Sequence, residues 1–174
     1  GSDKQYEKGI TAMDIAKSIS NKFADSVLVC ELNGKAIDLS APLDEDGKIM
    51  FFKFDSPEGK ECYWHTSSHM MAQAIEELYP GAKFGVGPAI ESGFYYDVDS
   101  NTKFTEDDLK KIEERILEIA KRNIKPVREE MPRLKAIEYF KNKRIDPYKV
   151  EILETIAGEE EIVSLYNQGE FTDL

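Results

Sequence analysis

The chain has 174 residues, of which 41% are hydrophobic and 33% charged, and its net charge is −11 at pH 7. This composition is typical of one ordinary domain or two small ones, and it excludes a disordered or fibrous protein. No apolar run approaches the length of about eighteen residues that a membrane span needs, and no charged-then-apolar leader opens the chain. An acidic chain is also unlike a general nucleic-acid binder, which carries a basic excess. Its two cysteines, Cys30 and Cys62, are too few for a disulfide framework, so we expect reduced thiols in a cytosolic protein.

The charge is distributed unevenly along the sequence. Residues 151–174 hold seven acidic and no basic side chains, whereas residues 103–144 hold thirteen Lys or Arg against nine acids. The basic stretch has two interpretations: a solvated helix with ion pairs between neighbouring turns, which we favour, or a basic binding face.

Residues 1–57 predict a small α+β unit that begins with a helix. Thr11 and Asp14 resemble a capping box, with Asp in place of the usual Glu. The helix is expected to run from this cap through Ile19.

Three apolar runs in the same unit predict short strands, at residues 27–30, 35–39 and 49–54. The first two are separated by Asn33-Gly34, a strong signal for a tight hairpin turn. A helix among short strands in so few residues suggests a β-grasp (ubiquitin-like) module. The sequence SPEG at residues 56–59 breaks the pattern, and we predict a domain boundary after residue 57.

Residues 58–174 predict a second α+β unit, with helices packed on an antiparallel sheet. Its expected elements are a helix at about 61–78, two strands within 84–98, a helix after Thr105, an extended stretch between Pro126 and Pro132, a helix at 134–143, and strands in the remainder. The helix after Thr105 is expected to present one apolar face, made of Leu109, Ile112, Ile116, Ile119 and Ala120.

Both histidines of the chain, His65 and His69, lie within one predicted helical turn. Spacing of four residues places two imidazoles on the same helix face, where they can hold a metal or flank a water. Thr66 stands where a zinc protease has its glutamate, which excludes that class. The alternatives are two unrelated polar residues or an incomplete metal site, because zinc normally takes three or four protein ligands. Cys62 could complete such a face, but a buried free thiol is the better interpretation.

Five segments together resemble the N-terminal part of the bacterial-type threonyl-tRNA synthetases. They are residues 11–16 (TAMDIA), 65–75 (HTSSHMMAQAI), 85–97 (GVGPAIESGFYYD), 146–150 (DPYKV) and 169–174 (GEFTDL). The first resembles the TGS domain of that family, and the other four resemble its editing domain, in the same order. The histidine pair alone is a weak signal, because alanyl-tRNA synthetase editing domains share it, but the combination is specific. The resemblance implies a TGS domain at 1–57 and an editing domain at 58–174.

This resemblance implies a proofreading hydrolase that removes serine from tRNA(Thr). An aminoacylation site for threonine cannot strongly reject serine, because a methyl-sized difference is worth only about 1–3 kcal/mol, so a second site must hydrolyse the mistake. The implied catalytic residues are His65, His69, Lys149 and Asp173, with Tyr96 as a wall of the substrate pocket. A histidine can position and deprotonate water, Lys149 can stabilise the oxyanion or protonate the leaving group, and Asp173 can recognise the substrate.

The resemblance also sets expectations for cofactors, partners and location. Editing needs no cofactor; zinc is an open question at the two histidines, while ATP, magnesium and a further zinc belong to catalytic portions outside this sequence. The expected partner is the 3′ end of tRNA(Thr), with no membrane, in a cytoplasmic enzyme that is a homodimer through its other domains. In the family a Cys-x-x-x-His block follows the final Asp-Leu pair, so weak or no deacylase activity is expected of residues 1–174 alone.

Three other interpretations stay open at this stage. The TGS-like unit could be an RNA- or nucleotide-binding regulatory module with the second unit as a spacer. The chain could be a structural zinc protein, or its second unit could be an editing domain of the alanyl-tRNA type.

Overall fold

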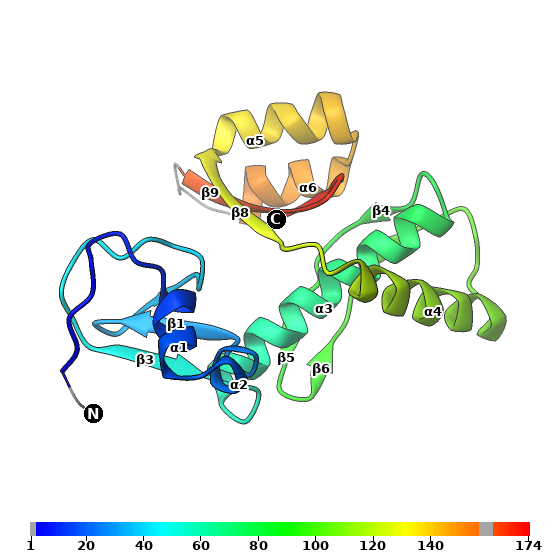
Figure 1. The fold of residues 1–174 in the computed structure, drawn as a ribbon. Coiled ribbons are helices and arrows are strands. Elements are labelled where there is room, and N and C mark those ends of the chain that lie inside the picture. Colours follow the sequence, from blue (N-terminus) through cyan, green and yellow to red (C-terminus); the bar gives the residue numbers. More distant parts are fainter. Residues whose placement is uncertain (1–2, 157–161) are drawn as a thin grey trace. The chain divides into compact units, whose positions relative to one another are not determined.

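Helices and short antiparallel strands build two separate units, drawn as a ribbon in Figure 1. This computed structural model describes residues 3–156 and 162–174. One unit comprises the chain up to Trp64 together with Ile90–Gly93, and the other comprises His65–Ala89 and Phe94–Leu174. The expected α+β fold class is confirmed.

The first unit is a small sheet with two helices. Its elements are α1 (Ala12–Ile19), α2 (Asn21–Ala24), β1 (Val29–Leu32), β2 (Lys35–Ile37) and β3 (Ile49–Phe52). The strands are antiparallel in the order β2-β1-β3. Asn33 and Gly34 join β1 to β2 with φ of 53° and 81°, the left-handed pair that a type I′ turn requires. The predicted hairpin is therefore confirmed.

The cap of α1 is also as predicted. Thr11 Oγ1 accepts the N–H of Asp14 at 3.1 Å and donates to that residue's carboxylate at 2.7 Å. The helix then buries Ala12, Ile15 and Ala16 on one face.

Helix α3 (Pro57–Leu78) starts four residues earlier than the sequence pattern predicts. The Oγ of Ser56 accepts the N–H of Gly59 at 3.0 Å, and Pro57 stands at the first helical position, where its missing N–H is no loss. The predicted domain boundary after residue 57 thus lies at the start of this helix. In the structure, the boundary between the two units falls within α3, between Trp64 and His65.

After α3 the described residues form four short strands, three α-helices, two π-helical segments (η1 and η2) and a three-stranded sheet. Their bounds are β4 (Lys83–Phe84), β5 (Ala89–Ile90), β6 (Gly93–Phe94), β7 (Val98–Asp99), α4 (Glu106–Arg122), β8 (Val127–Pro132), α5 (Arg133–Tyr139), η1 (Phe140–Arg144), α6 (Pro147–Glu151), η2 (Ile152–Ile156), β9 (Ile162–Gln168) and β10 (Phe171–Asp173). The large sheet is antiparallel in the order β10-β9-β8. Helices α5 and α6 cover one face of this sheet (Figure 1).

Two sequence predictions for this region differ from the structure. The two strands expected within 84–98 are each interrupted, giving β4 paired with β7 and β5 paired with β6. The sequence also predicts strands throughout the stretch after residue 143, but residues 147–156 are helical. The part of that prediction at 157–161 lies outside the described residues, and the strands β9 and β10 confirm it further on. Asp146 caps α6 and Pro147 follows at its first position, and this start signal outweighs the alternating pattern.

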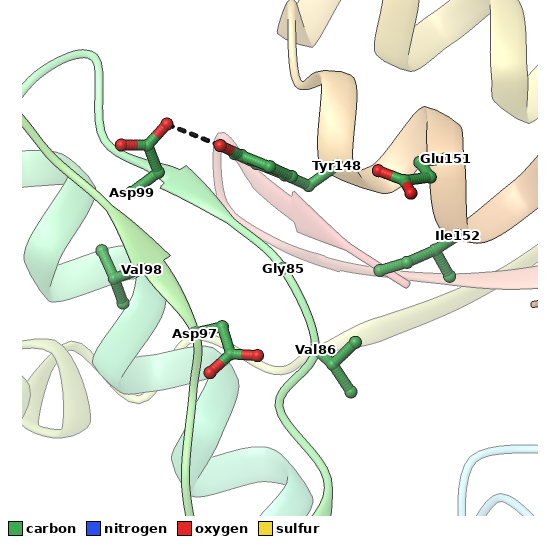
Figure 2. Close-up of a pocket in the computed structure, with 8 residues that line it drawn as sticks. All are labelled: Gly85, Val86, Asp97, Val98, Asp99, Tyr148, Glu151 and Ile152. Atoms are coloured by element: carbon green, nitrogen blue, oxygen red, sulfur yellow. Dashed lines mark hydrogen bonds between the residues drawn. The ribbon is translucent and has the colours of Figure 1, made fainter.

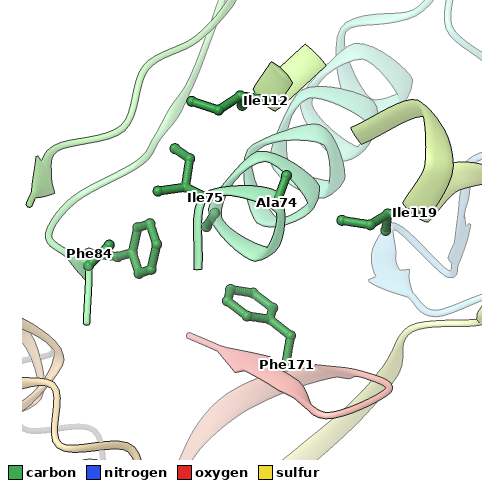
Figure 3. Packing of buried hydrophobic residues seen from close by; sticks show 8 residues of the cluster. Ala74, Ile75, Phe84, Ile112, Ile119 and Phe171 are labelled. Carbon is green, nitrogen blue, oxygen red and sulfur yellow. The ribbon is translucent and has the colours of Figure 1, made fainter. Parts of the chain in front are cut away.

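The second unit has two apolar cores. In the first, shown in Figure 3, side chains of α3, α4, β4 and β10 meet: Ala74, Ile75, Phe84, Ile112, Ile119 and Phe171. In the second, α5, η1, α6 and η2 pack against β9 through Phe140, Leu153 and Leu165. Of the predicted apolar face of α4, Ile112 and Ile119 are buried, but Leu109 is 57% exposed, because the stripe is wider than the face that packs. Within the described part of the chain, no helix is long and apolar enough to cross a membrane.

Candidate functional site

The two histidines lie together on the part of α3 that belongs to the second unit. The centroids of the His65 and His69 rings are 4.5 Å apart, and the rings meet edge to face at 78°. The ring of Tyr166, on β9, is 5.7 Å from each of them. His69 is buried and His65 is half-buried, so the pair runs from the interior towards the surface.

Lys149 and Asp173 form a buried ion pair beside these rings. The distance from Lys149 Nζ to Asp173 Oδ1 is 2.6 Å, and both side chains are almost wholly enclosed, at 6% and 2% exposure. The ammonium also donates to the Tyr96 hydroxyl at 2.7 Å and to the Gly85 carbonyl at 3.2 Å. All three ammonium hydrogens of Lys149 thus have acceptors within the protein.

Asp173 connects this pair to the histidines. Its Oδ2 accepts the Tyr96 hydroxyl hydrogen at 2.6 Å and lies 3.9 Å from Nε2 of His69. Its Oδ1 also accepts the backbone N–H of Leu174 at 2.9 Å. The structure therefore brings His69, Lys149, Asp173 and Tyr96 into one network, and His65 adjoins it through His69. Their catalytic and substrate-binding roles stay predictions.

The network also determines the protonation of its members. Burial lowers the pKa of His69 to about 4, with His65 and Lys149 acting in the same direction and Asp173 opposing them. Burial pushes the pKa of Asp173 upward, but Lys149, His69 and the hydrogen bonds from Lys149 and Tyr96 outweigh it and hold that pKa below its usual range. Burial and the nearby Asp173 charge raise the pKa of Tyr96 far above its ordinary value. At neutral pH the site therefore holds a neutral imidazole, a carboxylate and a phenol.

Two residues for which no role was predicted from the sequence support this arrangement. Asp146 caps α6, which places Lys149 in the network. Tyr166 is directly opposite Asp173 in the β9–β10 register and borders both histidines. The Asp-Pro pair before α6 is a recognisable cap signal, whereas nothing local distinguishes Tyr166 from other strand tyrosines.

Gly87 makes room for Tyr96. A Cβ atom built on Gly87 would lie 2.6 Å from two carbons of the Tyr96 ring. We expect Gly87→Ala to displace that ring from Asp173 and to lower the free energy of unfolding by about 1–3 kcal/mol, as overpacking does. Chemical denaturation measures this loss.

Gly85→Ala is a matched control for that substitution, because its Cβ would come no closer than 3.2 Å to Asp97 Cβ and 3.6 Å to the Asp97 carbonyl oxygen. The control is expected to have the smaller effect. If Gly87→Ala is as stable as Gly85→Ala, the close approach to Tyr96 is not a constraint.

A cavity of about 430 Å³ lies beside the helical segment that carries Tyr148 and Glu151 (Figure 2). It is lined by Gly85, Val86, Asp97, Val98, Asp99, Tyr148, Glu151 and Ile152. The Tyr148 hydroxyl donates to Asp99 across it at 2.7 Å. None of the five candidate residues lines this cavity, and its three carboxylates make it a poor receptor for the phosphates of a nucleic acid.

Among the described residues, no group of three or more His, Cys, Asp or Glu side chains is arranged to hold a metal ion. The ring-to-ring contact of His65 and His69 and the commitment of Asp173 to Lys149 and Tyr96 are consistent with that finding.

The basic stretch of residues 103–144 is extensively paired with acids. Arg115 and Arg122 on α4 both contact Glu77 of α3, and Arg144 contacts Glu76. Further ion pairs involve Lys110, Lys111, Arg128 and Lys141. These contacts support the interpretation of a surface with ion pairs over that of a free basic binding face.

Comparison with known proteins identifies the group to which the chain is related. Residues 1–53 match the TGS domain family. Over all 174 residues the chain is 58% identical to a threonine–tRNA ligase of Chlorobium phaeovibrioides, 55% to that of Chlorobaculum tepidum and 59% to that of Pelodictyon phaeoclathratiforme. Over its whole length the chain is thus similar to a segment of the threonine–tRNA ligases. It covers 26% of the length of each of these three relatives.

The resemblance predicted from sequence motifs, to a part of a bacterial threonyl-tRNA synthetase that carries a TGS domain, is thus confirmed. The TGS match lies in the first unit, whereas the network around His69 lies in the second. Any chemistry of this ligase segment at the histidines therefore belongs to the portion outside the TGS match.

Proposed function

We propose that the second unit edits the product of a threonine–tRNA ligase by hydrolysing seryl-tRNA(Thr), in a cytoplasmic enzyme whose other portions attach threonine with ATP. The proposal rests on the similarity to threonine–tRNA ligases and on one observation, the buried network of His69, Asp173, Lys149 and Tyr96. Such a concentration of enclosed polar groups on separate elements is typical of a site of chemistry. The full-length enzyme is proposed to be a homodimer through its other domains.

The groups in the network suit ester hydrolysis. The reaction needs a positioned water, stabilisation of the tetrahedral oxyanion and a proton for the leaving ribose oxygen. An imidazole with a pKa near 4 is a weak base at neutral pH, so His69 is better suited to orienting a water than to removing its proton. Lys149 supplies the positive charge for the oxyanion, and it must exchange one of its present acceptors to do so.

Asp173 is suited to recognising the amino acid. Its low pKa keeps Asp173 a carboxylate at neutral pH. The ammonium group of an esterified serine is similar in size and charge to the Lys149 ammonium that Asp173 already binds. Tyr96 then fixes the carboxylate and forms a wall rather than reacting, because its raised pKa keeps the phenol protonated.

The test replaces His65 and His69 with alanine in a full-length ligase that contains this segment. We expect seryl-tRNA(Thr) to accumulate while threonylation continues, measured with radiolabelled serine and threonine. Thr66→Ala is the matched control, because Thr66 is exposed on the same helix between the histidines.

The alternatives give different results in the same experiments. If the variant without His65 and His69 accumulates no more seryl-tRNA(Thr) than the parent, the interpretation of an RNA- or nucleotide-binding module is favoured. Preferential hydrolysis of seryl-tRNA(Ala) would indicate an editing domain of the alanyl type. Stoichiometric zinc in the purified chain, lost together with His65 and His69, would favour a structural zinc protein.

A further inference from the structure

Asp146 is a buried carboxylate that belongs to none of the proposed catalytic groups. It is 7% exposed, and both of its oxygens accept hydrogen bonds from the backbone. Oδ1 accepts the N–H groups of Tyr148 and Lys149 at 3.1 and 3.4 Å, which caps α6. Oδ2 accepts the N–H of Phe84 on β4 at 3.2 Å. One side chain therefore joins a helix and a strand that lie 62 positions apart in the sequence.

Both of these attachments lead directly to Lys149. The helix that Asp146 caps carries Lys149 itself in its first turn. On the strand, the residue after Phe84 is Gly85, whose carbonyl accepts from Lys149 Nζ at 3.2 Å. Asp146 thus holds the backbone of Lys149 and the backbone of Phe84, the residue directly before one acceptor of the Lys149 ammonium.

Phe84 extends the same support to the other members of the network. Its ring packs edge to face against Tyr96 and Phe171, with centroids 5.6 and 6.4 Å away. Phe171 is on β10, two residues before Asp173. A shift of Phe84 would therefore disturb Tyr96, which is hydrogen-bonded to both Lys149 and Asp173, and it would disturb the strand β10, which carries Asp173.

The side chain must have two acceptor oxygens to make these contacts together. Asparagine offers one acceptor and an amide donor, which would face an N–H group. Serine offers a single oxygen, enough for a helix cap but not for the strand as well. A carboxylate is buried tolerably here because three backbone N–H groups surround it.

We propose that Asp146 is a positioning residue, which fixes Lys149 against Asp173 and the Gly85 carbonyl by tying the start of α6 to β4. This inference rests on the proposed editing function, since it assigns Asp146 a part in that reaction. Asp146 does not touch the reacting atoms and acts through Lys149.

The test compares Asp146→Ser and Asp146→Ala in a full-length ligase, with deacylation of preformed seryl-tRNA(Thr) measured as kcat and KM. Serine keeps the cap of α6 but leaves the buried N–H of Phe84 without its acceptor, so thermal stability should fall by less than in the alanine variant, while kcat falls. Alanine loses both attachments, and kcat should fall by about 10- to 100-fold, the effect of misplacing a catalytic group by about 1 Å. KM should change by less than about threefold in both variants, because the substrate-recognising carboxylate of Asp173 is retained.

Thr105→Ala is the matched control. Thr105 caps α4 in the same unit through a complete capping box, away from Lys149. Its loss should lower the melting temperature about as much as Asp146→Ala does, with kcat unchanged. A kcat of Asp146→Ser within twofold of the parent, or an equal fall in kcat for Thr105→Ala, would overturn the inference.

A His69→Ala variant measured in parallel separates this inference from the proposed function. If His69→Ala retains deacylation, the editing function itself is wrong. If His69→Ala loses it and Asp146→Ser keeps the parental kcat, only the positioning role fails.

Discussion

Replacing Lys149 with methionine is expected to destabilise the second unit by about 3–5 kcal/mol and to reduce seryl-tRNA(Thr) deacylation by about 100-fold or more. The substitution keeps the apolar volume of the lysine stem but removes the cation that contacts Asp173 at 2.6 Å. Asp173 is 1% exposed, and a buried charge without its partner costs several kcal/mol. Loss of a group that stabilises an oxyanion typically reduces kcat by about 10²–10³-fold. Denaturation of the chain at pH 7 and deacylation by the full-length ligase measure the two effects.

The pH dependence of this difference follows from Asp173. With Lys149 present, the pKa of Asp173 is below its ordinary value of 3.8, so the carboxylate stabilises the fold above that pH, and the stabilisation is lost as pH falls. Without Lys149, burial is the largest remaining influence, and the pKa of Asp173 should rise above 3.8. The stability gap between parent and variant should therefore be largest at neutral pH and shrink in acid.

A double variant, Lys149→Met with Asp173→Asn, is the control for this interpretation. It removes both charges, and it should recover part of the stability while deacylation stays lost. If Lys149→Met unfolds at the same denaturant concentration as the parent at pH 7, the ion pair does not stabilise the native state.

Acidification from pH 6.5 to 4 is expected to lower the stability of the second unit by about 3 kcal/mol through His69. The pKa of His69 falls from 6.5 to about 4 on folding, chiefly because the ring is buried. Below pH 6.5 the unfolded chain therefore binds a proton that the folded chain excludes, and each unit of pKa difference is worth about 1.4 kcal/mol. The penalty fades as pH rises above 6.5, because the unfolded chain then loses its proton as well.

Titration of the His69 ring by NMR should give a midpoint near pH 4, and denaturation at a series of pH values should give the stability slope. Between pH 6.5 and 5 the stability slope reports on histidine titration. Carboxylates such as Asp173 and Glu77 have lowered pKa values, so they affect stability only in stronger acid. His69→Asn should remove most of the slope in that interval, whereas His65→Asn, which retains His69, should keep it. A midpoint above pH 6 for His69 would contradict the buried, neutral imidazole.

The hairpin, the helix caps and the histidine pair could be predicted because their signals are local. Asn33-Gly34 adopts left-handed φ at both residues, and Thr105 completes a capping box with Asp108, each determined by residues within one turn. His65 and His69 share a helix face because they are four residues apart. The wrong strand prediction after residue 143 could also have been avoided, because Asp146-Pro147 is a local signal for the start of a helix.

The network itself could not be derived from local patterns. Lys149 and Tyr96 are 53 positions apart, and Tyr96 and Asp173 are 77 apart, so no periodicity connects them. The motif resemblance named these residues together, but it could not give their hydrogen bonds, nor the roles of Asp146 and Gly87 in holding them. The net charge of −11 was a coarse guide in the same way, because many cations of residues 103–144 are paired with acids that only the fold brings near.

By itself the sequence determined the resemblance to a segment of the threonine–tRNA ligases, the α+β class and the helix face that carries both histidines. Only the tertiary structure decided that His69 is neutral, that Lys149 has all its donors occupied and that Asp173 remains a carboxylate. The physical reason is that helix faces and turns depend on neighbouring residues, whereas burial and charge pairing depend on which distant segments pack together.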